Sequence, residues 1–154
     1  MTQRPTLIFD FDSTLVGFET LEALADVALD GAPDAEAVRS EIAALTDRAM
    51  AGEIPFGEAL RRRLALLPLR REHVEAVAAR AVDALTPSVR RNLRFFAEAR
   101  GLVVILSGGF REIIAPVARE LGVSAERVLC NDLIYDDAGR VIGVDDANPL
   151  SHAD

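Results

Sequence analysis

The 154-residue chain contains no lysine and no tryptophan, and it has a single cysteine. All 17 basic residues are therefore arginine, and with 25 acidic residues the formal net charge is −8. A charge of this sign argues against a nucleic-acid-binding protein, because such a protein needs a basic surface to neutralise phosphates. It does not exclude a small anionic substrate, since one local site can oppose the charge of the whole protein.

The sequence also gives no sign of a membrane or secretory protein. The single Cys130 cannot form a disulfide within the chain, which is typical of a reducing compartment. No apolar run approaches the ~20 residues that a membrane span needs. Residues 1–5 lead directly into a short apolar segment, unlike a signal or transit peptide. We therefore expect a cytoplasmic protein whose partners are neither a membrane nor nucleic acid.

Hydrophobic periodicity predicts an α/β domain interrupted by a helical insert. Apolar runs of strand length occupy 6–11 and 102–106, and 128–130 fits a short third strand. Helical spacing covers 19–30, 34–51, 56–67, 71–85, 86–100 and 110–121, and a hairpin is expected to turn at 136–139. Parallel strands joined by helices are the expected core, over 1–17 and 86–154, with a helical cap over 18–85.

The first candidate site is Asp10-Phe11-Asp12-Ser13-Thr14, which follows the first expected strand. Residues two apart in an extended segment point to the same side, so the two carboxylates would lie close together. Ligands of open α/β sheets bind at the carboxyl ends of strands, and Mg²⁺ prefers oxygen ligands of this kind. An isolated pattern of this type is more often a solvated strand end or a helix cap. The preceding strand and the following hydroxyls favour a functional site here.

The second candidate site is Ser107-Gly108-Gly109, which we expect to form a tight turn between a strand and a helix. Its hydroxyl and backbone N–H groups would face an anion, with support from the helix N-terminus. Glycine lets the backbone approach such a ligand closely. A serine that merely caps the helix would explain the segment if it stood alone. Two strand ends that both suggest phosphate make a stronger case together.

These two segments resemble the haloacid dehalogenase superfamily of aspartate-nucleophile phosphatases, and most narrowly its phosphoserine-hydrolysing members. The resemblance is carried by residues 9–15 and 106–110, and it extends through Glu19 and the arginines at 61–63 to nearly the whole chain. It implies a Rossmann-like parallel sheet with an inserted helical-bundle cap. It further implies a Mg²⁺-dependent hydrolase of a small phosphomonoester, O-phospho-L-serine, acting in serine biosynthesis.

The resemblance also implies a role for each residue near the phosphate. Asp10 would attack the phosphorus and form an aspartyl-phosphate. Asp12 would protonate the leaving oxygen and then activate the water that hydrolyses the intermediate. Mg²⁺ would be bound by Asp10 and by the backbone carbonyl of Asp12. Ser107 and the N–H of Gly108 would bind the phosphate oxygens.

On the cap side, the resemblance implies that Glu19 pairs with the substrate ammonium and Arg63 with its carboxylate. Met50 and Phe56 would line the pocket from the cap. Each residue also has a plainer explanation. Glu19 could simply complement the helix dipole, one or more of the arginines at 61–63 could face solvent, and Met50 and Phe56 could belong to the core.

Two elements of the superfamily pattern are missing from this sequence. One is a lysine that ties the nucleophile to the phosphate, and the other is a strand end whose aspartates complete the metal site. The acidic residues at 145–146 come too early to replace the latter. We therefore expect an N-terminal portion of a longer enzyme, with a core incomplete at its C-terminal side. The Asp10 strand would then expose an apolar edge, which could pair or swap with a second copy.

Three functions remain open from the sequence. The first is phosphoserine hydrolysis, and the second is hydrolysis of another small phosphomonoester. The third is a catalytically incomplete fragment that only binds phosphate or a partner. The absence of lysine favours this third hypothesis for the 154-residue chain taken by itself, whereas Glu19 and Arg63 favour the first.

Overall fold

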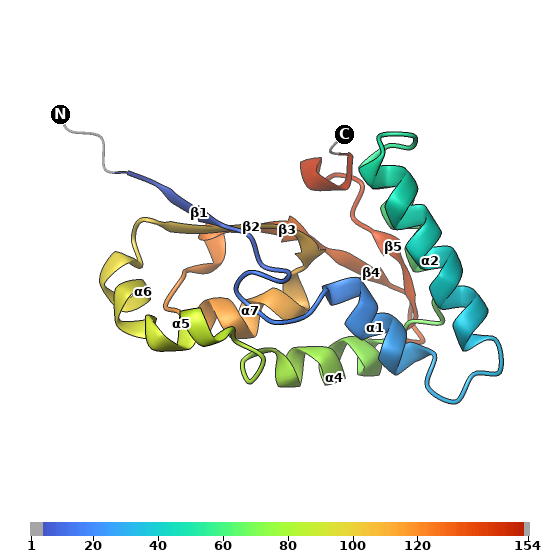
Figure 1. Ribbon diagram of the computed structural model, residues 1–154, viewed down its shortest axis with the longest axis horizontal. Coiled ribbons are helices and arrows are strands. Elements are labelled where there is room, and N and C mark those ends of the chain that lie inside the picture. Colours follow the sequence, from blue (N-terminus) through green and yellow to red (C-terminus); the bar gives the residue numbers. More distant parts are fainter. Residues whose placement is uncertain (1–4, 153–154) are drawn as a thin grey trace.

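A computed structural model describes residues 5–152 and contains a three-stranded parallel sheet (Figure 1). Its strands are β1 (Leu7–Phe9), β2 (Val103–Phe110) and β3 (Val128–Asn131), in the order β1-β2-β3. Leu7 pairs with Val103 and Ile105 pairs with Val128, so β2 is the central strand. The parallel α/β core expected from the sequence is confirmed.

Strand β2 is longer than its apolar run predicts. Val103, Ile105 and Ser107 alternate as buried residues, and the strand continues through the glycines to Phe110. The expectation of a tight turn at 107–109 is therefore wrong. The pairing with β3 shifts register between Leu106 and Phe110, so the segment is an irregular strand end rather than a reversal of the chain.

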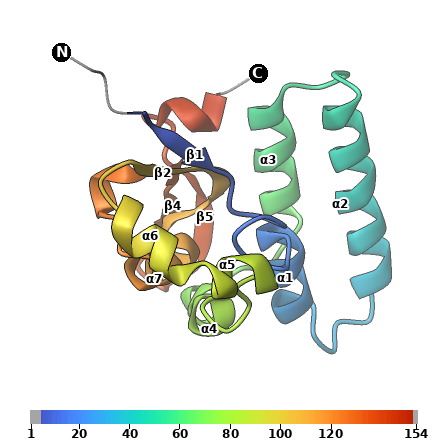
Figure 2. The same cartoon turned by 60° about the vertical axis from the view of Figure 1, so that its left-hand side comes forward.

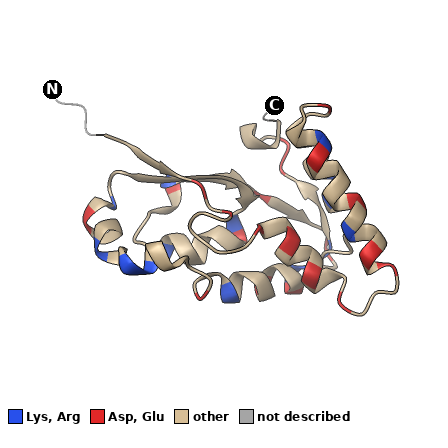
Figure 3. Ribbon diagram, in the orientation of Figure 1, with Lys and Arg blue, Asp and Glu red and all other residues tan. Residues whose placement is uncertain are grey.

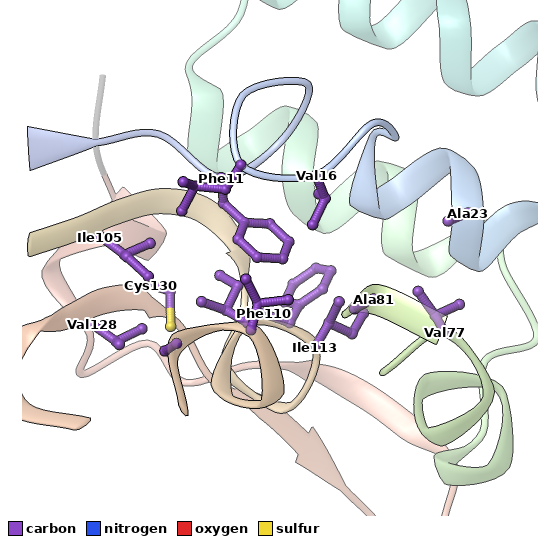
Figure 4. Close-up of a cluster of buried hydrophobic side chains, with 14 of the residues drawn as sticks. Phe11, Val16, Ala23, Val77, Ala81, Ile105, Phe110, Ile113, Val128 and Cys130 are labelled. Carbon is purple, nitrogen blue, oxygen red and sulfur yellow. The ribbon is translucent and has the colours of Figure 1, made fainter. Parts of the chain in front are cut away.

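Four helices lie on one side of the sheet: α4 (Arg71–Ala81), α5 (Pro87–Arg91), α6 (Leu93–Ala99) and α7 (Arg111–Glu120). The sequence predicted one helix over 86–100, but it is interrupted at Asn92. The Asn92 side chain donates a hydrogen bond to the Ser88 carbonyl (2.8 Å), and its own backbone leaves the helical region. Phe11, Ile105, Phe110 and Ile113 are among the buried side chains that these elements pack together (Figure 4).

The opposite face of the sheet is open. Ile8, Leu106 and Leu129 point to this face, and their exposed fractions are 64%, 38% and 48%. Strand β1 pairs only with β2 among the described strands, so its second edge is free, as the sequence led us to expect. The three strands carry no charged side chain, whereas the helices and loops carry many (Figure 3). The open face is therefore apolar.

The segment 18–85, which the sequence led us to expect as a helical insert, contains α1 (Thr20–Ala28), α2 (Ala35–Met50), α3 (Phe56–Ala65) and the α4 described above. Helices α2 and α3 lie side by side as a hairpin that stands away from the sheet (Figure 2). Helix α4, in contrast, packs along α7 of the core. Within residues 5–152, no helix is both long and apolar enough to cross a bilayer.

The last part of the described chain returns to α3. The antiparallel strands β4 (Leu133–Tyr135) and β5 (Val141–Val144) form the expected hairpin, and two 3-10 turns lie at Ala125–Arg127 and Pro149–His152. The second turn packs against α3, where a β-carbon added to Gly57 would lie 2.1 Å from the Ser151 carbonyl oxygen. Arg61 Nη1 also donates to that carbonyl (3.2 Å). Only glycine permits this close approach.

Candidate active site

The chain makes a tight loop directly after β1. The carbonyl of Phe11 accepts hydrogen bonds from the backbone N–H groups of Thr14, Leu15 and Val16. Ser13 adopts a left-handed conformation with φ of 51°, which is uncommon for a residue other than glycine. The loop is tied to the segment before α5, because Gly17 donates to Ala84 and the Thr86 hydroxyl donates to Thr14. These contacts hold Asp10 and Asp12 at the carboxyl end of β1.

Asp10 and Asp12 occupy different environments in this loop. Asp10 is exposed, and its carboxylate accepts the N–H of Phe11 at 2.7 Å. Asp12 is partly buried, and its Oδ1 accepts both the backbone N–H (3.1 Å) and the hydroxyl of Thr20. Burial, reinforced by the nearby Glu19 and Asp10 charges, raises the pKa of Asp12 to about 6 despite these hydrogen bonds. A carboxyl with that pKa can donate and accept a proton near neutral pH.

Ser107 and Gly108 lie at the end of β2. The Ser107 side chain is buried, and its Oγ accepts the N–H of Gly109 at 2.9 Å. Asn131, at the end of β3, donates from Nδ2 to the Gly108 carbonyl at 2.9 Å. This bond fixes the backbone of the segment just before α7, where N–H groups and the helix dipole favour an anion.

Thr20 joins the two strand ends. Its hydroxyl bonds to Asp12, and a β-carbon added to Gly109 would lie 3.2 Å from the same oxygen. The loop after β1 and the end of β2 therefore meet, as the two motifs predicted. The sequence reasoning missed Thr20, because a threonine at a helix start carries no distinctive signal.

A cavity of about 400 Å³ lies between α1 and the α2–α3 hairpin. Glu19 and Arg63 both line it, so the structure brings together the two residues expected to bind the substrate's charges. Thr46, which the sequence reasoning did not single out, lines it as well. Glu19 also accepts a hydrogen bond from the Ser13 hydroxyl (2.5 Å), and this contact links the cavity to the Asp10–Asp12 loop.

The guanidinium of Arg63 has no carboxylate within ion-pair distance among the described residues. Its Nε donates to the Ala59 carbonyl and its Nη1 to the Thr46 hydroxyl, both at 3.2 Å. Its neighbours differ, because Arg61 pairs with Asp146 (3.4 Å) and Arg62 with Glu58 (2.8 Å). Partial burial lowers the pKa of Arg63, as expected for a cation removed from water without a counter-ion. Arg63 is thus suited to receive an anion.

The two residues that were expected to line the pocket from the cap, Met50 and Phe56, lie in different surroundings. Phe56 contacts the Gly108 segment, since a β-carbon on Gly108 would lie 2.8 Å from the tip of the ring. Met50 is 84% exposed at the end of α2 and does not line the cavity. The structure therefore brings Phe56, but not Met50, to the site. Asp10, Asp12 and Ser107 do not line the cavity either, and they form a separate end of the site.

The oxygen atoms at the end of β1 fit a hard divalent cation. Asp10 and Asp12 supply carboxylate and carbonyl oxygens, and Glu19 and Asp10 place further negative charge beside the buried Asp12 carboxyl. Within the part of the chain that the structure describes, no three His, Cys, Asp or Glu side chains form a metal-binding group. A cation bound here would therefore complete its coordination with backbone oxygens, water or phosphate. Phosphatases of the superfamily that the sequence resembles generally use a divalent metal.

The chain belongs to the haloacid dehalogenase-like hydrolase family, whose sequence model matches residues 7–151. Among curated proteins, it is similar to the phosphoserine phosphatase of Homo sapiens, with 35% identity over 94% of this chain. It is also similar to phosphoserine phosphatase SerB2 of Mycobacterium tuberculosis, with 39% identity over 89% of this chain. The match covers 61% of the human protein and 32% of the mycobacterial protein, so the chain spans about three fifths or less of these relatives.

Solved structures show the same relationship. A phosphoserine phosphohydrolase-like protein from Francisella tularensis superposes with a TM-score of 0.83 at 27% identity, over 97% of this chain and 68% of that one. A substrate-bound phosphoserine phosphatase complex superposes with a TM-score of 0.70 at 29% identity, over 94% of this chain and 64% of that one. The fold resemblance expected from the sequence is therefore confirmed.

Proposed function

We propose that this chain acts in the hydrolysis of O-phospho-L-serine to serine and phosphate. The observation that carries the proposal is the pair Glu19 and Arg63, which present opposite charges in one cavity beside the Asp10–Asp12 loop. Phosphoserine carries an ammonium, a carboxylate and a phosphate, and these three charges match the three parts of the site. The 35% identity to human phosphoserine phosphatase supports the same substrate.

The chemistry at the phosphate end uses the two aspartates in different roles. A carboxylate oxygen of Asp10 forms a bond to phosphorus while the bond from phosphorus to the serine oxygen breaks. Asp12 gives its proton to the departing serine oxygen, which its pKa of about 6 allows. Asp12 then takes a proton from water, whose oxygen attacks phosphorus and frees Asp10 and inorganic phosphate.

Ser107 and Gly108 orient the phosphate in this proposal, because they lie near the end of β2, shortly before α7, with a backbone fixed by Asn131. Mg²⁺, held by the Asp10 carboxylate and the Asp12 carbonyl, would neutralise charge on the phosphate oxygens. Phe56 closes over Gly108 from the cap and excludes water from the reacting group.

At the amino-acid end, Glu19 binds the ammonium and Arg63 binds the carboxylate of the substrate. The remaining N–H donors of Arg63 suit a planar, paired contact with a carboxylate. We further propose that the protein works in the cytoplasm, because its single cysteine is typical of a reducing compartment. A role in serine biosynthesis follows from the proposed reaction, because serine is its product. The free edge of β1 would allow pairing with a second copy.

The second candidate function is binding of phosphoserine without turnover. The observation that favours it is the absence of lysine from all 154 residues, since the resemblance leads us to expect a lysine near the nucleophile. In that case the same residues would hold the ligand, but phosphate would not be released.

The deciding experiment measures Mg²⁺-dependent phosphate release from L-phosphoserine by the purified chain, with Asp10→Asn as the control. Calorimetry on the same samples measures binding of L-phosphoserine. We expect release by the wild-type chain that disappears in the variant. Binding without release would establish the second candidate, and neither binding nor release by a folded chain would contradict both.

A further inference from the structure

Thr46 on α2 forms a hydrogen bond with the guanidinium of Arg63 on the neighbouring helix α3. Its Oγ1 accepts a hydrogen bond from Arg63 Nη1 at 3.2 Å. The same hydroxyl donates to the carbonyl of Ile42, one helical turn earlier, at 3.0 Å. The bond to Ile42 directs the hydroxyl proton away from Arg63, which leaves an oxygen lone pair facing the guanidinium.

The Arg63 side chain is held at two points. Its Nε is fixed by Ala59 on its own helix, and its Nη1 is fixed by Thr46 on the facing helix. An arginine side chain loses considerable rotational freedom when it is fixed, and a protein that fixes it before binding spares the ligand that cost. The guanidinium keeps its other N–H donors for a carboxylate.

The chemical nature of Thr46 matters as much as its position. A carboxylate at this place would hold Arg63 equally well but would also neutralise it, as happens to Arg61 and Arg62. A neutral hydroxyl holds the guanidinium and leaves its charge available. Thr46 lines the same cavity as Glu19 and Arg63, so the contact is made inside the binding space.

We infer that Thr46 is a positioning residue that holds Arg63 in place for the carboxylate of the ligand. This inference rests on the proposed function, because it concerns the amino-acid end of the same site. The plainer explanation is that Thr46 bonds to Ile42 only as helical threonines often do, and that its proximity to Arg63 has no consequence for binding.

The experiment compares two ligands that differ in the carboxylate. L-Phosphoserine and O-phosphoethanolamine share the phosphate and the ammonium, but only the first has a carboxylate. Calorimetry with the full chain in the absence of divalent metal, so that the Mg²⁺-dependent hydrolysis does not take place, measures both affinities for wild type, Thr46→Val, Thr46→Ser and Ser40→Ala. Valine keeps the shape of threonine without the hydroxyl, serine restores the hydroxyl, and Ser40 is an exposed residue on the same helix.

We expect Thr46→Val to weaken phosphoserine binding about tenfold, the size of a lost hydrogen bond to a charged group. Phosphoethanolamine binding should change less than about twofold, and both Thr46→Ser and Ser40→Ala should behave like wild type. If Thr46→Val does not fold, Thr46→Ala takes its place, with thermal unfolding recorded for each variant.

Two results would overturn the inference while leaving the proposed function intact. One is a wild-type preference for phosphoserine that persists in Thr46→Val. The other is an equal loss for both ligands, which would indicate a structural role for Thr46. If wild type binds both ligands equally, the carboxylate site itself is absent, and the proposed function fails together with the inference.

Discussion

The two ends of the candidate site are built in different ways. The phosphate end consists of strand ends and a short loop. Backbone hydrogen bonds to the Phe11 carbonyl and a side-chain hydrogen bond from Asn131 to the Gly108 carbonyl fix its shape. The amino-acid end is a cavity between helices, and it is lined by side chains such as Arg63 and Glu19. In the proposed function, the chemistry that requires fixed atoms therefore takes place at the sheet, and the cap helices recognise the substrate.

The two ends also treat charge differently. At the phosphate end, like charges are brought together, and the pKa of Asp12 rises to about 6 because its carboxyl is buried beside Glu19 and Asp10. At the amino-acid end, a guanidinium is left without a counter-ion among the described residues. Each end thus holds an electrostatic imbalance that a ligand can relieve: a cation or proton at one end, and a carboxylate at the other.

The largest effect is expected from Asp10→Asn, which changes the phosphate end of the site and leaves the amino-acid end intact. The amide is a much weaker nucleophile than the carboxylate, so phosphate release should fall by more than about a thousandfold for any phosphomonoester. Asp10 is exposed, and thermal unfolding should hardly change. Parallel assays with L-phosphoserine and p-nitrophenyl phosphate check this, and substantial turnover of either by the variant would remove Asp10 from the mechanism.

The next effect comes from Arg63→Met, which keeps the apolar stem and removes the charge. We expect affinity for L-phosphoserine to fall between about tenfold and a hundredfold, because a charged hydrogen-bonded contact is lost. O-Phosphoethanolamine, which has no carboxylate, should bind as before. Arg62→Met is the matched control, since Arg62 lies on the same helix but already pairs with Glu58, one turn earlier on that helix. If Arg63→Met lost the same affinity for both ligands, Arg63 would not act through the substrate carboxylate, and the two ends would not bind different groups of the ligand.

The phosphate end could be predicted from the sequence more completely than the amino-acid end. Asp10 and Ser107 stand in contiguous motifs at strand ends, and parallel strands must bring such ends to one edge of the sheet. The motif was therefore enough to place them, although it did not show that β2 continues to Phe110. The strand pairing that extends it is a long-range contact with β3, which local residue types do not reveal.

The amino-acid end depends on how two helices are placed relative to each other. Among three adjacent arginines, only the resemblance pointed to Arg63. The local residue types do not show that Arg61 and Arg62 pair with acids, whereas Arg63 has no carboxylate within ion-pair distance in residues 5–152. The sequence does not indicate Thr46 either, because its hydrogen bond with Arg63 joins two different helices. Met50 was placed in the pocket by resemblance alone, and the structure leaves it exposed.

A smaller effect, on stability rather than binding, is expected for Asp12→Asn. Folding raises the pKa of Asp12 from 3.8 to about 6, so between these values the folded chain binds more protons than the unfolded chain. The free energy of unfolding must therefore fall as the pH rises through this window, by about 3 kcal/mol for this group. Asparagine still accepts from Thr20 but carries no charge to bury.

We therefore expect Asp12→Asn to be more stable than wild type above pH 6 and to lose that advantage near pH 4. Urea unfolding at both pH values, in the absence of divalent metal, measures the difference. Asp30→Asn, a change at an exposed acid outside the site, is the control. A stability difference that does not depend on pH would contradict the account of Asp12.

The smallest effect concerns the contact between the two ends, where Phe56 from the cap touches Gly108 of the sheet. Gly108→Ala places a β-carbon 2.8 Å from the tip of the ring, whereas Gly101→Ala meets nothing within 4 Å. Because the ring can move aside, the loss of unfolding free energy relative to Gly101→Ala should be only about 1 kcal/mol. The displaced ring should admit water to the phosphate end, so turnover should fall more than affinity for L-phosphoserine. Unfolding and initial-rate measurements on the two variants test this, and a fall in affinity with unchanged turnover would show that Phe56 serves the amino-acid end instead.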